Sequence, residues 1–247
     1  MLGISVPHRI GIGDAIQFTM VPENYFRTFG KKLIDVEKHW VFDHNPFVLR
    51  GGEKPAKVAG LWNFNPIPKP RGSVFTSLAE KHTLCVGAKV FLRHPRLYKF
   101  EDFPFRDRHM ILFQAKGISH GPLPKKIVEH VIKKYRGPDL YQIGHANEVL
   151  HDIGIPWVCT PTVWDLVEVI SRARMYIGPD SGPSWIAACY PDIVIKKVRM
   201  KPTIDQLKNW VPLEITNTHA QWDDLQLHSV YNPTEDDIGF TSSYLRL

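Results

Sequence analysis

The sequence of 247 residues contains few cysteines and no long uninterrupted apolar run. Its three cysteines, Cys85, Cys159 and Cys189, are odd in number and show no Cys-x-x-Cys or other metal-ligand spacing. This argues against a disulfide framework and a zinc site, and we expect the cysteines to be small core residues. Because the apolar runs are short and interrupted, no segment is predicted to span a membrane. Low-complexity tracts and internal repeats are also lacking.

The first residues lack the features of a secretory signal peptide. The segment MLGISVPHRIGIGD has no charged start, no long apolar stretch and no small-residue cleavage site. We therefore expect a cytoplasmic protein. The hydrophobic content of 43% and charged content of 23% are typical of a soluble globular chain. Its length suits one large α/β domain or two small ones.

The net charge of +6 is unevenly distributed. Residues 31–100 contain thirteen Lys and Arg against five acids, whereas the residues after 218 are mostly acidic among their charged positions. A basic N-terminal half suggests an anionic partner, which could be a phosphorylated glycan, an acidic lipid surface or nucleic acid. Solvated lysines without any partner are the alternative explanation.

Apolar periodicity predicts strands that alternate with helices along the chain. Predicted strands are 2–6, 32–36, 109–117, 139–144, 155–160, 175–177 and 192–198. Predicted helices are 15–30, divided or kinked at Pro22, then 73–84, 124–137, 162–174 and 183–189. This alternation predicts an α/β fold of two Rossmann-like halves, each a parallel sheet covered by helices, with a ligand in the cleft between them.

The stretch YIGPDSGPSWIAACYP, residues 176–191, predicts a strand, a tight turn and a helix. Gly, Pro, Asp and Ser favour the turn, and Pro183 suits the first position of the helix. The unpaired N–H groups and the positive end of such a helix can bind phosphate or another anion. An ordinary strand-to-helix connection without a ligand fits the pattern equally well.

Two motifs, RIGIGDAIQFTMVP and WDLVEVISRARMYIGPDSGPSWIAA, resemble the signature regions of the ADP-heptose:lipopolysaccharide heptosyltransferases, glycosyltransferase family 9. The second motif matches the family pattern of Asp-(Ser/Thr)-Gly-Pro followed by a run of alanines. Trp185 stands where the family usually has a histidine. The second half of the chain matches well, whereas the first half is shorter than in the family and its acceptor-binding part is largely unmatched.

The resemblance implies a GT-B fold with a reduced N-terminal half. It also implies transfer of a sugar from a nucleotide-sugar donor, with inversion and without a tightly bound metal or other cofactor. Asp14 would be the catalytic base, although Asp14 as a helix N-cap is the alternative. The expected donor-binding residues are Gly13, Lys116, Ser119, Gly144, Asp180, Ser181, Gly182 and Ser184. Gly144 is included because the loop after its strand is where a Rossmann-like half holds a nucleotide base or ribose.

We expect an acceptor-side half over 1–105, a donor-binding half over 106–200, and an extension, 201–247, that packs back on the N-terminal half. The acceptor would be anionic: a lipopolysaccharide core or other surface glycan, or else a nucleic acid, with peripheral membrane contact compatible with the charge. Two other functions stay open. One is a non-catalytic module that binds a nucleotide or a glycan, and the other is a nucleotide-sugar epimerase of GT-B fold.

Overall fold

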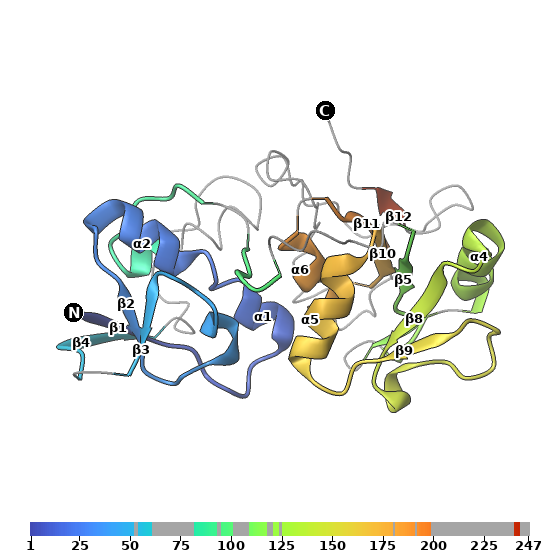
Figure 1. Cartoon of the computed structure of the whole chain (residues 1–247), viewed down its shortest axis with the longest axis horizontal. Helices are drawn as coiled ribbons and strands as arrows, with labels where there is room; N and C mark the ends of the chain where they lie inside the picture. Colours follow the sequence, from blue (N-terminus) through green and yellow to red (C-terminus); the bar gives the residue numbers. More distant parts are fainter. Residues whose placement is uncertain are drawn as a thin grey trace, which may run out of the picture.

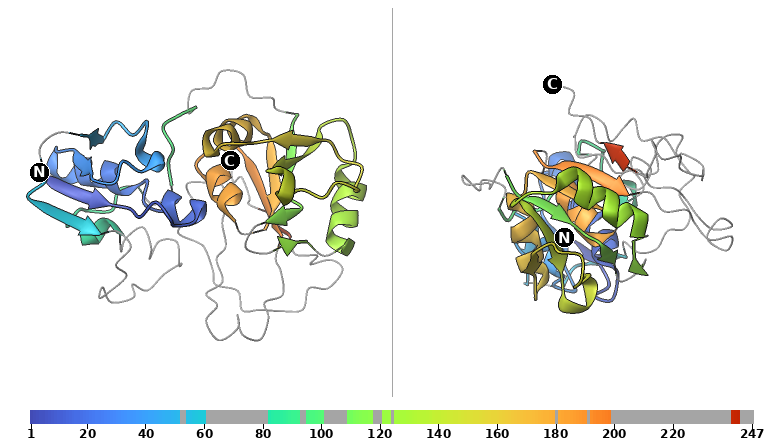
Figure 2. Two further views of the ribbon diagram at one scale, coloured as in Figure 1. Left: turned by 90° about the horizontal axis from the view of Figure 1, so that it is seen from below. Right: turned by 90° about the vertical axis from the view of Figure 1, so that its right-hand side faces the viewer.

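The computed structural model describes residues 1–51, 54–60, 82–92, 95–100, 109–117, 121–123, 125–179, 181–190, 192–198 and 240–242. In this part of the chain, two mainly parallel sheets stand side by side along the long axis of the molecule (Figure 1). Helices α1, α5 and α6 lie between the sheets, and α4 lies beyond the second sheet in both side-on views (Figure 1, Figure 2). The molecule is therefore a mixed α/β protein.

The first sheet is parallel throughout and has the strand order β3-β2-β1-β4. Gly3 of the central strand pairs with Ile34 on one side and with Val58 on the other. The strands are β1 (Leu2–Ser5), β2 (Leu33–Asp35), β3 (Val48–Arg50) and β4 (Lys57–Gly60). The helices are α1 (Ile12–Ile16), α2 (Val21–Phe29) and the short 3-10 helix η1 (Trp40–Phe42).

The second sheet has the order β12-β11-β10-β5-β8-β9, and only β12 is antiparallel. The strands are β5 (Ile111–Phe113), β8 (Leu140–Gly144), β9 (Trp157–Cys159), β10 (Met175–Gly178), β11 (Val194–Val198) and β12 (Phe240–Ser242). The helices are α4 (Lys125–Tyr135), α5 (Val163–Arg172), α6 (Gly182–Ala188) and the 3-10 helix η2 (Ala146–Glu148). Strands β6 (Lys116–Gly117) and β7 (Gly121–Pro122) form a separate hairpin.

Local sequence signals set the helix ends. The Thr162 hydroxyl accepts from the Asp165 N–H at 3.2 Å, while the Asp165 carboxylate accepts from the Thr162 N–H and hydroxyl, so α5 begins with the predicted capping box. Hydrogen bonding to Thr162 holds the pKa of Asp165 below its usual range. Pro22 lies in the first turn of α2, so the predicted segment 15–30 is divided into two helices, and Gly30 ends α2 with φ +66°.

Alternating side chains place two apolar cores on the two faces of the second sheet. Leu112 and Tyr176 point into a core that also contains Ile4 and Leu33 of the first sheet. Phe113 and its neighbours on the opposite face pack against α4 in a second cluster. Because burial of apolar surface is the main favourable term in folding, the shared core joins the two sheets into one folded unit.

The sequence did not predict β3 and β4. Both are only three or four residues long, too short for a periodic pattern, and β4 lies at an edge with Val58 45% exposed. Helix α6 begins at Gly182, so Pro183 is its second residue. Residues 73–81 of the predicted helix 73–84 lie outside the described residues.

Of the expected extension 201–247, only β12 is described, and it joins the second sheet rather than the N-terminal half. The rest of the extension lies outside the described residues. No helix in the described ranges is long and apolar enough to cross a membrane.

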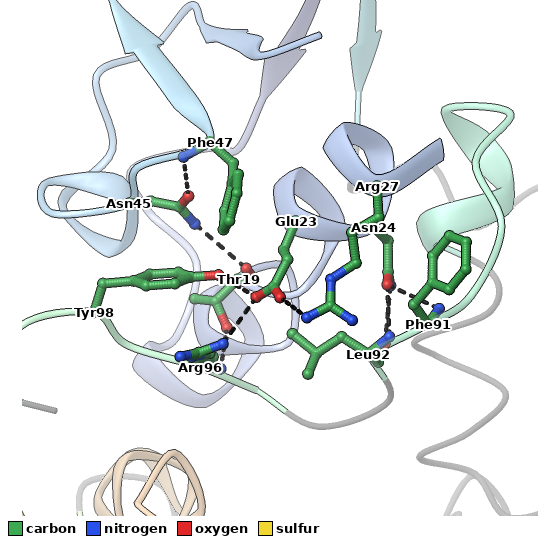
Figure 3. A network of polar contacts seen from close by, with 10 residues as sticks. All are labelled: Thr19, Glu23, Asn24, Arg27, Asn45, Phe47, Phe91, Leu92, Arg96 and Tyr98. Atoms are coloured by element: carbon green, nitrogen blue, oxygen red, sulfur yellow. Dashed lines mark hydrogen bonds and ion pairs between the residues drawn. The ribbon is translucent and has the colours of Figure 1, made fainter. Parts of the chain in front are cut away.

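A polar network fastens α2 to residues 82–92 and 95–100 (Figure 3). Glu23, only 2% exposed, binds Arg27, the Arg96 guanidinium at 3.3 Å and the Tyr98 hydroxyl at 2.6 Å. The Asn24 amide oxygen accepts from two backbone N–H groups, those of Phe91 and Leu92, and its Nδ2 donates to the Leu92 carbonyl and to the Thr83 hydroxyl. Buried side chains thus substitute for regular secondary structure in holding this segment.

We expect Glu23→Ala to lower the free energy of unfolding by about 2 kcal/mol, because it removes charged hydrogen bonds made by a buried carboxylate. The matched control is Glu129→Ala, since Glu129 pairs with Lys125 on the surface at 3.8 Å and its loss should cost less than about 0.5 kcal/mol. Urea titration of both variants measures the difference. Equal losses in the two variants would contradict the structural role of Glu23.

Candidate active site

Both sheets share a strand order that creates a ligand-binding position in α/β proteins. In each sheet, the first strand along the chain (β1 or β5) lies between the next strand and a later one (β4 or β10). From β1 and β5 the chain continues to a strand on one side, β2 or β8, whereas β4 and β10 lie on the other side. Ligands of such sheets bind outside the carboxyl ends of the strands at this switch point. The segments that follow β1, β5 and β10 are accordingly the candidate site.

Two hydroxyls and one amide meet at the β5–β10 switch point. The Tyr176 hydroxyl and Ser181 Oγ each donate to Oε1 of Gln114 at 2.6 Å. The turn between them needs glycine at position 178, because a Cβ there would lie 2.4 Å from the Tyr176 hydroxyl oxygen. The turn is therefore shaped by contacts with β5 as well as by its own sequence.

The start of α6 is held by its own serines. The Ser181 N–H donates to Ser184 Oγ at 3.0 Å, and that hydroxyl donates to the Ser181 carbonyl at 2.7 Å. Gly182 faces α1, and a Cβ on Gly182 would lie 2.7 Å from the Ile12 Cβ. Three of the predicted donor-binding residues, Ser181, Gly182 and Ser184, thus form one compact turn.

Helix α1 brings the N-terminal motif against this turn. Its N-cap is Gly11, so Asp14 is in the first turn but is not the N-cap. The Asp14 side chain is exposed, and its Oδ2 would lie 3.1 Å from a Cβ on Gly11. Gly13 packs on Trp185, with only 2.7 Å between an added Cβ and the indole Cδ1. The structure therefore places Gly13, the residue before Asp14, against α6.

Trp185 has a packing role at the position where heptosyltransferases usually have histidine. The side chain is 4% exposed and belongs to the core shared by the two sheets. Its indole covers Gly13 across the contact between α1 and α6. A bulky apolar ring therefore occupies the place of an imidazole in this motif.

Two further predicted donor residues, Lys116 and Gly144, lie along the same edge of the second sheet. Lys116 begins β6, whose next residue, Gly117, approaches Gln114: a Cβ on Gly117 would lie 3.5 Å from Gln114 Nε2. Gly144 ends β8, and its carbonyl accepts from the Trp157 indole N–H at 2.8 Å. Ser119 and Asp180 lie outside the described residues.

Gln114 was missed by sequence reasoning. The sequence feature that could have revealed it is an uncharged polar residue directly after the buried strand ILF, where a buried apolar residue would be expected. The side chain is 4% exposed and accepts hydrogen bonds from Tyr176 on β10 and from Ser181 in the turn after it. Only the strand order, which puts β5 beside β10, reveals that meeting.

A buried polar cluster lies at the carboxyl edge of the first sheet. The Arg50 guanidinium binds Asp43 and the His39 carbonyl, and one of its nitrogens lies 3.5 Å from the Asp35 carboxylate. Burial raises the pKa of Asp35, while the charge of Arg50 opposes this increase. Arg50 thereby joins β2, β3 and η1 at the edge that faces the second sheet.

His39 belongs to the same cluster and is 1% exposed. Its ring stacks on His8 with centroids 5.3 Å apart, and its Nδ1 accepts from the Val41 N–H at 3.4 Å. Burial lowers the pKa of His39 to about 4, and the positive charge of His8 and Arg50 adds to the effect, against a smaller opposite effect of Asp43. The imidazole is therefore neutral at neutral pH.

Direct contacts also join the first sheet's loops to the helices of the second sheet. The Trp164 indole N–H of α5 donates to Asp43 Oδ2 at 3.0 Å, and the Lys99 ammonium lies 4.6 Å from the centroid of the Trp164 ring. The Tyr190 hydroxyl donates to the Lys99 carbonyl at 2.9 Å. These contacts hold both halves of the candidate site in one arrangement.

No family model and no curated protein matches the chain. Seven chains of solved structures match it. One is TibC of enterotoxigenic E. coli H10407, described as a bacterial iron-containing dodecameric glycosyltransferase, with 14% identity, a TM-score of 0.49, and coverage of 81% of this chain and 60% of that one. Another is TibC described as an iron-containing dodecameric heptosyltransferase in complex with ADP-D-β-D-heptose, with 14% identity, a TM-score of 0.52, and coverage of 81% and 59%.

The likeness to the second TibC structure shows a similar fold. Our chain spans only about 60% of the length of these structures. Over the described ranges, no three His, Cys, Asp or Glu side chains gather as a metal site would require. Cys85 and Cys159 are exposed and Cys189 is buried, so the expectation of three core cysteines holds only for Cys189.

We expect Gly13→Ala to lower the free energy of unfolding by about 1–3 kcal/mol, because the new methyl group would overlap the Trp185 ring in a packed core. The matched control is Gly137→Ala at an exposed position, where the nearest atom to an added Cβ is 4.0 Å away and the change should stay within about 0.5 kcal/mol. Thermal and urea unfolding measure both. A Gly13→Ala protein as stable as the control would show that α1 and α6 are not in this close contact.

His39 should make stability depend on pH. Its pKa is lower in the folded chain, at about 4, than the ordinary value of 6.5, so the unfolded chain binds more protons between these values. Its contribution to stability is thus complete above pH 6.5 and is lost as the pH falls toward 4. We expect His39→Gln to flatten this part of the curve of unfolding free energy against pH, and His151→Gln, at an exposed histidine, to leave it unchanged. A curve of unchanged slope in His39→Gln would refute the assignment.

Proposed function

We propose that the chain is a GT-B glycosyltransferase that transfers a sugar from a nucleotide-sugar donor to an acceptor hydroxyl with inversion at the anomeric carbon. One observation carries the proposal: α1 packs directly on α6, so the Gly13–Asp14 motif of the first half lies against the Ser181–Ser184 turn of the second. The switch-point strand order of both sheets supports it further. So does the fold likeness to a heptosyltransferase solved with ADP-D-β-D-heptose.

Asp14 is the proposed catalytic base. Its side chain is exposed, so an acceptor hydroxyl can reach it. The carboxylate takes the proton of the acceptor hydroxyl while that oxygen forms a bond to the anomeric carbon. The bond from this carbon to the donor diphosphate breaks, and its electron pair leaves with the diphosphate. Attack from the side opposite the leaving group inverts the anomeric centre.

The donor would lie along the carboxyl edge of the second sheet. The Gly182 backbone N–H at the start of α6, with Lys116 on the neighbouring hairpin, would stabilise the charge that develops on the departing diphosphate. Gly144 would border the nucleoside at the end of β8. Asp180 and Ser119 remain donor-binding proposals from the motif. No tightly bound metal or other cofactor is part of this mechanism.

The acceptor would lie along the first half, which has an excess of basic residues. An anionic acceptor fits this charge, and a lipopolysaccharide or another surface glycan fits the resemblance best. We propose that the reaction takes place in the cytoplasm. Residues 1–105 are the proposed acceptor-side half, and 106–200 the proposed donor half.

We expect Asp14→Asn to reduce the transfer rate by at least about 100-fold, the usual contribution of a general base. Donor affinity should stay within about threefold, because the neutral amide has the same shape and the proposed donor contacts lie on the second sheet. Asp152→Asn, at an exposed aspartate of the second sheet, is the matched control and should keep the full rate. Release of nucleoside diphosphate is followed for a panel of nucleotide sugars, with glycan acceptors and without any acceptor.

The outcomes distinguish the proposal from its rivals. Acceptor-dependent release that Asp14→Asn abolishes supports the glycosyltransferase. Binding of a nucleotide sugar without any turnover indicates a binding module. Conversion of the donor without an acceptor indicates an epimerase. A full rate in Asp14→Asn would remove the base assignment.

A further inference from the structure

Gln114 uses only half of its amide in the described structure. Oε1 accepts from the Tyr176 and Ser181 hydroxyls, both at 2.6 Å. With two donors on this oxygen, the amide is held in one orientation and Nε2 faces away from the hydroxyls. No hydrogen-bond acceptor for Nε2 is found over the described ranges, although the side chain is only 4% exposed.

Although the residue as a whole is 4% exposed, the Nε2 atom is not fully buried, so its N–H is open to a ligand. Gln114 therefore stands out from Gln142 on the neighbouring strand. The Gln142 Nε2 donates to the Leu150 carbonyl at 2.9 Å, and its Oε1 accepts from the Leu150 N–H at 3.0 Å. Both polar atoms of the Gln142 amide thus have partners within the fold, whereas the Gln114 Nε2 has none among the described residues.

The surroundings of Nε2 indicate what it binds. Gln114 follows β5, the first strand of the second sheet, and in Rossmann-like units the turn after the first strand holds phosphate groups. Gly117 lies beside Nε2 without a side chain to cover it: an added Cβ would be 3.5 Å away. Lys116 adds positive charge on the same hairpin. A fixed N–H donor next to a cation suits an anionic oxygen.

We propose that Gln114 is a ligand-binding residue whose Nε2–H donates to a diphosphate oxygen of the sugar donor, with Tyr176 and Ser181 orienting the amide. This inference rests on the proposed function, because it assigns a contact within the same donor site. In this proposal the Ser181 hydroxyl orients the Gln114 amide and does not bind the phosphate itself. The Gln114 amide also supplies a hydrogen-bond donor in a site whose motif has Trp185 in place of histidine.

Gln114→Glu is the sharpest test. The carboxylate keeps an acceptor for both hydroxyls, but replaces the N–H donor with a second negatively charged oxygen. Calorimetric titration with ADP, GDP, UDP and CDP at pH 8 measures the effect on the diphosphate that the unaltered chain binds best. We expect affinity to fall at least about tenfold, as for a lost hydrogen bond to a charged group. The melting temperature of the variant is measured alongside, because a purely structural defect would lower it, whereas the loss of the N–H donor acts on affinity.

Asn24→Asp is the matched control. It makes the same amide-to-acid change at a buried side chain whose hydrogen bonds are structural (Figure 3). It should lower the melting temperature and leave the dissociation constant of the folded protein within about twofold. If Gln114→Glu does not fold, Gly117→Ala replaces it, because the methyl group would lie in van der Waals contact with Nε2 and occupy space beside it without touching the two hydroxyl bonds. We expect a loss of at least about threefold in diphosphate affinity from this variant.

The results separate the two proposals. If the unaltered chain binds a diphosphate and Gln114→Glu binds it equally well, the role of Gln114 is refuted and the glycosyltransferase proposal stands. If Gln114→Glu and the control Asn24→Asp weaken diphosphate binding by the same factor, the loss is structural and a direct donor role is refuted as well. If the unaltered chain binds none of the four nucleotides and no nucleotide sugar, both proposals fail together.

Discussion

The contact between α1 and α6 is the constraint on which the arrangement of the molecule depends. Each helix contributes a glycine to it: the Trp185 ring packs on Gly13, and the Ile12 side chain packs on Gly182. A side chain at either glycine would push the helices apart, so the two sheets can share one core only while both positions lack a Cβ. Since each helix follows the first or fourth strand of its sheet, the contact also brings the two candidate halves of the site together.

Polar contacts around this apolar centre restrict how the two halves can move. Trp164 reaches Asp43 from α5, Tyr190 reaches the Lys99 backbone, and Arg50 connects Asp43 to the buried edge of the first sheet. The arrangement therefore favours a site held in place by packing. Within it, the buried Trp185 ring contributes packing to the core shared by the two sheets.

Some elements could be predicted because their signals are local. The capping box of Thr162 and Asp165, the division of a helix at Pro22 and the glycine end of α2 depend on neighbours within a few residues, and all three are present. Strands β3 and β4 escaped prediction because each is stabilised by its partner strand rather than by its own pattern. Gln114 escaped because its partners are more than sixty positions away along the chain.

The sequence by itself determined the alternation of strands and helices, the turn around Gly182 and the capping box of α5, since backbone preferences and short-range hydrogen bonds decide these features. Tertiary structure alone decided that Gly13 lies under Trp185, that β5 lies beside β10, and that Tyr176 and Ser181 share the Gln114 amide. These contacts depend on strand order and on how the two sheets pack. The pattern of residues along a single strand or helix does not show which distant strand or helix will pack against it.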